Sequence, residues 1–201
     1  MAISATQVKE LRDKTGAGFM DCKTALTEAE GDLEKADTIL RTRGQARAAK
    51  RSGRSTSQGL VSSYIHMGGQ VGGLVEIGCE SDFVARTDEF QQLTRDIAMH
   101  IAAANPLYVT RDEVPSDVVD REKAIFRAQF EESNKPAQVI DKIVDGKMTS
   151  YYQQVVLLDQ PSIRDPKVSI TDLVTAAIAK MGENITIARF ARFKIGESPD
   201  S

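Results

Sequence analysis

The spacing of apolar residues changes partway along the chain, and this change constrains the fold more than any other feature. In residues 1 to about 52, apolar side chains recur every three or four positions, the period of an α-helix packed on one face. From Gly59 the period becomes two, which is typical of a strand with one buried face. The polar residues 52–57 in between have linker composition. The sequence therefore predicts an α+β fold, with a helical domain over 1–52 and an α+β core with an antiparallel sheet over 53–201.

Three short helices are expected in the first domain. Ser4 and Gln7 have the spacing of a capping box, which begins the first helix, and the two glycines of residues 15–18 end it. Asp21 can cap the second helix, and residues 31–32 end it and begin the third. Helices this short bury little surface, so we expect the domain to be only marginally stable alone. The apolar positions that should face its core are Val8, Leu11, Cys22, Ala25, Leu26, Ala29, Leu33, Ala36, Ile39 and Leu40.

The core begins with a predicted hairpin. Strand-like runs over residues 60–67 and 71–79 are separated by two adjacent glycines, a hairpin-turn signal. A short loop at 80–86 follows, and then a helix that ends before Pro106. This helix should present one apolar face, made of Phe90, Leu93, Ile97 and Ile101.

The second half of the core is mostly helical. Residues 112–150 predict an antiparallel helical hairpin with its turn at 134–136, and its narrow apolar stripes indicate that it projects from the core. Beyond it we expect three further elements: a strand over 155–158, a helix over 169–181 and a final strand over 185–195.

Charge is unevenly distributed along the chain. The 201 residues include 26 Lys and Arg against 29 Asp and Glu, a formal net charge of −3. Six of the basic residues lie between Arg41 and Arg54, with no acidic residue among them. Such a run is more often a solvated helix or linker than an RNA contact, and this one lacks aromatic side chains for stacking on single strands. We therefore expect no direct nucleic-acid binding.

Composition also bears on the compartment. No apolar run approaches the roughly 20 residues of a membrane span, and the amino terminus lacks the apolar core of a signal peptide. Two cysteines make no disulfide framework, which fits a reducing compartment. We expect a cytoplasmic protein without membrane association.

The sequence contains no recognisable set of catalytic or metal-binding residues. Neither phosphate-binding glycine motif is present, and the glycines of residues 68–73 fit a hairpin better than a phosphate loop. Cys22, Cys79, His66 and His100 could supply four zinc ligands, but no two of them have ligand spacing. A cysteine nucleophile needs an adjacent base, which the sequence does not place. We expect no enzyme activity, no metal and no cofactor.

Two positions could instead present side chains to another protein. His66 lies beside the Gly-Gly turn, where it is either a partner contact or an ordinary hairpin residue. Phe83 lies among charged neighbours next to Asp82, and an exposed Phe beside a carboxylate can anchor in a partner's pocket. The alternative is a helix entry in which Asp82 is the cap and Phe83 folds back into the core. The residues alone leave both pairs of alternatives open.

Two longer motifs resemble a known family. Residues 8–23, VKELRDKTGAGFMDCK, are similar to the amino-terminal signature of translation elongation factor Ts. Residues 79–86, CESDFVAR, are similar to its second signature, with Ser81 in place of the usual Thr. The resemblance covers essentially the whole chain, since shorter similar stretches occur at residues 97–103, 160–161 and 182–185.

This resemblance implies an activity and an architecture. It implies a guanine-nucleotide exchange factor that binds elongation factor Tu in its GDP-bound and nucleotide-free states. It also implies a three-helix domain similar to ubiquitin-associated domains, and a core with a protruding coiled coil. The single core resembles the short bacterial form, for which a homodimer is expected. No cysteine lies between Cys79 and Ser201, so an interchain disulfide through the final strand is excluded.

The matched motifs also imply site residues. Asp82 and Phe83 inherit the role of a wedge that enters the partner near its magnesium site. Arg12, Phe19 and Met20 match the surface that docks on the partner's nucleotide-binding domain, with Phe19 at a position where Met is often found.

The resemblance also implies two further contacts, and the residues leave other functions open. His66 and Ile163 match core positions implicated in gripping the partner. One alternative is a module that sequesters its partner without speeding nucleotide release, and another is an RNA-binding accessory protein that uses the basic run 41–54. A release assay separates the first from an exchange factor, and steep salt dependence would indicate the second.

Overall fold

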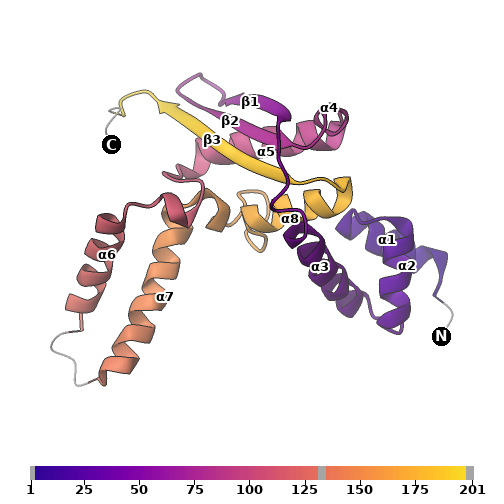
Figure 1. Ribbon diagram of the computed structural model, residues 1–201, viewed down its shortest axis with the longest axis horizontal. Helices are drawn as coiled ribbons and strands as arrows, with labels where there is room; N and C mark the ends of the chain where they lie inside the picture. Colours follow the sequence, from indigo (N-terminus) through magenta and orange to yellow (C-terminus); the bar gives the residue numbers. More distant parts are fainter. Residues whose placement is uncertain (1–2, 131–134, 198–201) are drawn as a thin grey trace. The chain divides into compact units, whose positions relative to one another are not determined.

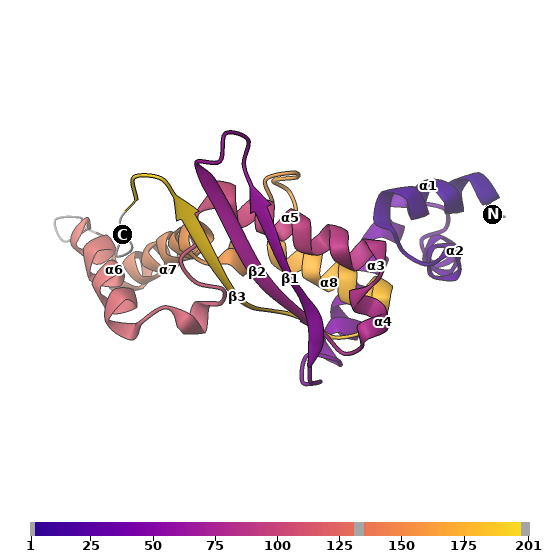
Figure 2. The ribbon, with the colours of Figure 1, turned by 90° about the horizontal axis from the view of Figure 1, so that it is seen from above.

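The computed structural model of the chain describes residues 3–130 and 135–197. Its three strands form one antiparallel sheet in the order β1-β2-β3. The strands lie side by side in Figure 2. Together with the helices this is an α+β fold, as predicted. The elements in chain order (Figure 1) are α1 Ala5–Thr15, α2 Phe19–Glu28, α3 Leu33–Ala49, β1 Gln58–Ile65, β2 Val71–Cys79, α4 Asp82–Ala85, α5 Asp88–Ala104, η1 Arg111–Glu113, α6 Ser116–Ala128, α7 Ala137–Val155, η2 Leu157–Asp159, α8 Ile170–Met181 and β3 Ile185–Lys194.

Contacts between residues divide the chain into two units. The first holds the described residues of 1–61, 77–94 and 172–187, and the second holds those of 62–76, 95–171 and 188–201. Each unit is therefore assembled from three separate stretches of sequence. The domain boundary near residue 52 follows a different criterion, the change in periodicity, and stays a prediction.

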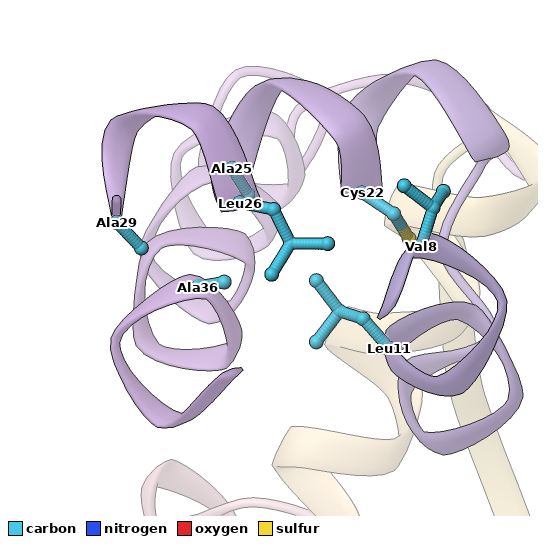
Figure 3. Close-up of a cluster of buried hydrophobic side chains, with 7 residues drawn as sticks. All are labelled: Val8, Leu11, Cys22, Ala25, Leu26, Ala29 and Ala36. Carbon is cyan, nitrogen blue, oxygen red and sulfur yellow. The ribbon is translucent and has the colours of Figure 1, made fainter. Parts of the chain in front are cut away.

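Helices α1, α2 and α3 of the first unit enclose a small apolar cluster. The predicted capping box is present: the Ser4 Oγ accepts the backbone N–H of Gln7 at 3.2 Å, and the Gln7 Oε1 accepts that of Ser4 at 3.0 Å. Gly16 ends α1 at φ +67°, a left-handed conformation that favours glycine. The apolar faces predicted from the helical period therefore meet. Their side chains converge in Figure 3, and the buried members are Val8, Leu11, Cys22, Ala25, Leu26, Ala29 and Ala36.

Asp21 does not cap α2, which corrects the prediction. The helix begins earlier, at Phe19, after Gly18 in an extended conformation, so Asp21 lies within the first turn. Its carboxylate accepts hydrogen bonds from the Arg47 guanidinium at 2.8 and 3.0 Å. This bond to Arg47 lowers the pKa of Asp21. A local pattern cannot show such a partner, because it comes from another helix.

The basic run begins in α3, which holds Arg41, Arg43 and Arg47. Lys50, Arg51 and Arg54 follow the end of this helix at Ala49. Gly44 of α3 is buried, and a Cβ there would lie 3.4 Å from the Cβ of Ala179 on α8. The helix therefore packs on α8 at a point where a side chain has little room. Four of the six basic side chains form ion pairs: Arg41 with Asp172, Arg43 with Glu28, Arg47 with Asp21 and Arg54 with Glu80.

The hairpin of β1 and β2 has the predicted turn. Gly68 and Gly69 adopt φ of +90° and +69°, and the N–H of Gly69 donates to the carbonyl of His66 at 2.9 Å. In the second unit β2 packs on α5, because a Cβ at Gly73 would lie only 3.0 Å from the carbonyl oxygen of Ala98. A side chain larger than that of glycine would therefore not fit at this position without a shift of α5.

Helices α6 and α7 occupy most of the segment 112–150 that was predicted to be helical, but α7 continues beyond it to Val155. Arg127 of α6 pairs with Asp141 of α7, and the Lys147 Nζ donates to the Gln129 Oε1 at 2.9 Å. Asn134, at the predicted turn between them, lies outside the described residues. Within the described residues, no helix combines the length and apolar character needed to cross a membrane.

The strand predicted over residues 155–158 is wrong. Helix α7 runs to Val155 and η2 follows directly, so only an isolated bridge from Val156 to Tyr108 remains of a strand. Val156 and Leu157 are buried, and a short buried apolar run has the same pattern in a helix end as in a strand. The last helix and the last strand, α8 and β3, match the prediction.

Candidate partner-binding site

The loop after β2 presents an exposed phenylalanine. Residues 82–85 form the single turn α4, and Phe83 is 83% exposed while Ala85 is buried. The cap is Ser81 rather than Asp82, because the Ser81 Oγ accepts the N–H of Val84 at 3.3 Å. Of the two arrangements that the sequence left open, Phe83 takes the outward one.

The Asp82 carboxylate is also exposed. It pairs with Arg86 one turn later, at 2.8 Å, and the two side chains are 52% and 80% exposed. An exposed pair of this kind contributes at most about 1 kcal/mol. The carboxylate can therefore exchange Arg86 for another donor at little cost, while α4 keeps it beside Phe83.

Two carboxylates from different parts of the first unit hold the base of α4. The Glu183 Oε2 accepts the backbone N–H groups of Glu80 at 3.1 Å and Ser81 at 2.9 Å, and the Glu183 Oε1 accepts the Ser81 hydroxyl at 2.5 Å. In return, the Glu80 Oε1 accepts the backbone N–H of Asn184 at 2.6 Å. We call this reciprocal arrangement the Glu80–Glu183 clamp. The bond from Asn184 is the main cause that lowers the pKa of Glu80, and Arg54 adds to it.

Cys79 anchors the same loop from the end of β2. Its side chain is buried, and its Sγ donates to the carbonyl oxygen of Ser81 at 3.1 Å. Burial raises the pKa of the Cys79 thiol, and the nearby charge of Glu183 raises it further. The thiol is therefore a neutral donor at neutral pH and contributes to holding the loop.

The predicted docking residues surround the turn between α1 and α2. Arg12 is exposed in the last turn of α1. Phe19 and Met20 begin α2 and are 50% and 66% exposed, although Cys22 two residues later is fully buried. Two apolar side chains and a cation are thus presented from one turn, an arrangement that suits contact with another protein.

His66 and Ile163 belong to the second unit, on separate segments. His66 is exposed at the hairpin, where its Nδ1 lies 3.0 Å from the Tyr64 hydroxyl. Ile163 is 43% exposed, on the loop between η2 and α8. All seven predicted site residues are thus at the surface, but their contact with a partner stays a prediction.

A buried histidine supports the loop that carries Ile163. The Gln160 amide nitrogen donates to the carbonyl oxygen of Gln154 at 2.8 Å, so its Oε1 accepts from the His100 Nε2 at 2.9 Å. The His100 Nδ1 then accepts the N–H of Ile163 at 3.4 Å. His100 is therefore neutral, with its proton on Nε2. Its burial lowers its pKa.

The four residues considered for zinc do not gather. Cys22 and Cys79 are both buried as free thiols on different elements, and His100 is bonded to Gln160. Over residues 3–130 and 135–197, no group of three or more His, Cys, Asp or Glu side chains has the placement to hold a metal ion.

The anchoring residues of α4 are what sequence reasoning missed. Ser81 could have been identified, because a serine three residues before a helical N–H is a standard cap signal. Glu183 lies in the stretch 182–185 that resembles the family, but no local pattern assigns its partner, since it contacts Ser81 from 102 positions away in the chain.

These surfaces define a class of protein. Exposed apolar and charged side chains on anchored turns are typical of a protein that acts by contact with another macromolecule. A family model described as elongation factor TS matches residues 35–197. The chain therefore belongs to the elongation factor Ts family.

Full-length relatives agree with this assignment. An elongation factor Ts of Fervidobacterium nodosum is 57% identical over 197 residues, which cover 98% of this chain and 100% of the relative. Those of Koribacter versatilis and Desulfosudis oleivorans are 55% and 53% identical, over 98% and 97% of this chain and 90% and 98% of the relatives.

Proposed function

We propose that the chain is a guanine-nucleotide exchange factor that promotes GDP release from elongation factor Tu during translation elongation. Membership of the elongation factor Ts family supports the exchange role. The mechanism is supported by one observation: Phe83 is 83% exposed, on a turn whose first residues are held by hydrogen bonds to Glu183. On this proposal Phe83 and Asp82 enter the partner near its magnesium site. The protein acts through binding alone, without a covalent step, in the cytoplasm.

Exchange by this route requires that the factor bind the nucleotide-free partner more tightly than the GDP-bound partner. Coupling between two ligands is reciprocal, so a factor that weakens GDP is itself weakened by GDP to the same extent. A nucleotide with a Kd of about 1 nM is bound by about −12 kcal/mol. A weakening of about 10⁴-fold requires about 5.5 kcal/mol of coupling. Displacing the surroundings of Mg²⁺ supplies part of it, because the ion neutralises the phosphate charges.

The amino-terminal helices are proposed to tether the complex. We propose that α1–α3 form the domain similar to ubiquitin-associated domains, and that it docks on the partner's nucleotide-binding domain through Arg12, Phe19 and Met20. Their exposure beside the Gly16 turn supports this. His66 and Ile163 are proposed to add contacts from the second unit.

Helices α6 and α7 are proposed to form the protruding coiled coil. A homodimer is proposed to form through the outer face of the sheet in the second unit. A Cβ at Gly72 would lie 2.9 Å from the Ile65 Cδ1, which puts Ile65 on the side away from Gly73 and α5. Glu76 pairs with Arg189 at 2.7 Å, so Phe193, four residues further along β3, lies on this side of the sheet, and Ile195 directly follows the strand. Ile65, Leu74, Phe193 and Ile195 are 68%, 43%, 69% and 77% exposed.

Nucleic-acid binding is less well supported. Arg41, Arg43, Arg47 and Arg54 already pair with carboxylates, at 2.6 to 3.4 Å, so RNA would have to displace these partners.

The test uses elongation factor Tu loaded with a fluorescent GDP and mixed rapidly with excess unlabelled GDP. Under the proposal, release accelerates in proportion to the concentration of this protein. If the two proteins bind but release stays at its spontaneous rate, the protein sequesters its partner and the exchange role is refuted.

A further inference from the structure

The Glu80–Glu183 clamp joins two turns that the chain separates widely. Gly182 ends α8 at φ +77°, and Glu183 and Asn184 follow it directly before β3. Their partners, Glu80 and Ser81, directly precede α4. The Asn184 side chain is fixed in addition, because its Nδ2 donates to the carbonyl oxygen of Arg54 at 2.8 Å. Three donors thus converge on the Glu183 carboxylate, and hydrogen bonds from the neighbouring Asn184 hold the turn that carries it.

Helix α4 depends on such an anchor. It has four residues, far fewer than an isolated helix needs to persist in water. Phe83 is 83% exposed, so its ring gains almost no packing that would fix its direction. The direction of the ring is therefore set by the backbone of α4. That backbone is held at Ser81 by Glu183.

We infer that Glu183 is a positioning residue for nucleotide exchange, which acts by holding α4 in the conformation that presents Phe83 and Asp82. This inference rests on the proposed function of those two side chains. The charge of Glu183 matters because hydrogen bonds to an ionised acceptor are stronger than those between neutral groups. An anchored wedge enters the partner without first being ordered, and this preorganisation lowers the cost of the exchange step.

The first experiment compares Glu183→Ala with Glu113→Ala. Glu113 is a matched control: its carboxylate also accepts a backbone N–H, from Val109 at 2.9 Å, and a hydroxyl, from Thr110 at 3.3 Å, but in the second unit. We expect Glu183→Ala to lower the exchange rate at saturating factor about tenfold, equal to about 1.4 kcal/mol. Its affinity for the partner should change less than threefold, since the docking residues are untouched.

The conservative variant Glu183→Gln provides a rescue. Its carbonyl oxygen can still accept the N–H groups of Glu80 and Ser81, but these bonds are weaker without the charge, so part of the exchange rate should return. Equal rates for Glu183→Ala and the Glu113→Ala control overturn the inference. So does a Glu183→Ala protein that is unfolded by circular dichroism, because the residue would then serve stability in general.

The double variant Phe83→Ala/Glu183→Ala separates this inference from the proposed function. If Glu183 acts through α4, adding Glu183→Ala to Phe83→Ala lowers the rate by less than about threefold. A full further tenfold loss means independent action and refutes the inference. If Phe83→Ala alone exchanges at the wild-type rate, the proposed wedge fails instead.

Discussion

Truncation of Phe83 to alanine is expected to slow nucleotide release by a factor that follows from its exposure. Complete burial of a Phe side chain contributes about 1.5–3 kcal/mol. Because 83% of Phe83 is exposed in the free protein, about 1.2–2.5 kcal/mol remains to be gained in the partner. At 1.36 kcal/mol for each factor of ten, the loss corresponds to about 8- to 70-fold slower exchange.

The same number predicts little change in stability. Less than a fifth of Phe83 is buried in the free protein, so truncation costs about 0.5 kcal/mol or less. For a chain of this length that lowers the melting temperature by about 2 °C at most. The variant should therefore separate exchange from folding.

Stopped-flow release of fluorescent GDP, with factor in excess, measures the rate. Leu107→Ala is the control, because Leu107 is also exposed, at 51%, and belongs to no proposed contact. A Phe83→Ala rate within twofold of that control would refute the reasoning. A melting temperature lowered by 5 °C or more would also refute it, because the ring would then support the fold.

Three further predictions concern the rest of the molecule. Burial lowers the pKa of His100, so as the pH falls below about 6.5 the unfolded chain binds the proton first and the free energy of unfolding decreases. Urea titrations between pH 5 and 8 should show this decrease toward low pH, and it should be smaller in His100→Gln. In α7, Gly146→Ala should raise the free energy of unfolding by about 0.4–1 kcal/mol, since a Cβ there meets nothing within 4 Å. Gly44→Val should lower it by about 1–3 kcal/mol, because the added side chain would crowd Ala179. The reverse order of stability in thermal melts would contradict this packing. Phe193→Asp should shift sedimentation toward the monomer, because it places a charge on the proposed dimer face, and an unchanged sedimentation coefficient would argue against that face.

Elements with a clear period could be predicted from the sequence. The helical faces around Leu11 and Leu26, the capping box at Ser4 and the hairpin turn at Gly68 each depend on neighbouring residues, and all are present. The predictions that were wrong concern residues whose role is set elsewhere in the fold. Asp21 forms an ion pair with Arg47 of another helix, and the apolar run at 155–158 is buried at a helix end.

The candidate site divides in the same way. The motif placed Asp82 and Phe83 on a loop, but the residues alone could not decide whether Phe83 faces outward. That depends on the cap at Ser81 and on Glu183, which reaches it from the far end of the sequence. A contact across 102 positions leaves no periodic or local trace in one sequence.

The length of that separation has a consequence for synthesis. A ribosome adds Glu183 about a hundred residues after it has made the loop that carries Phe83. Until Glu183 has emerged, α4 lacks the carboxylate that holds it, and contacts so distant along the chain form late in folding. A growing chain would therefore contain its amino-terminal helices well before α4 is ordered. Under the proposed function, a growing chain would therefore speed nucleotide release only after Glu183 has been added.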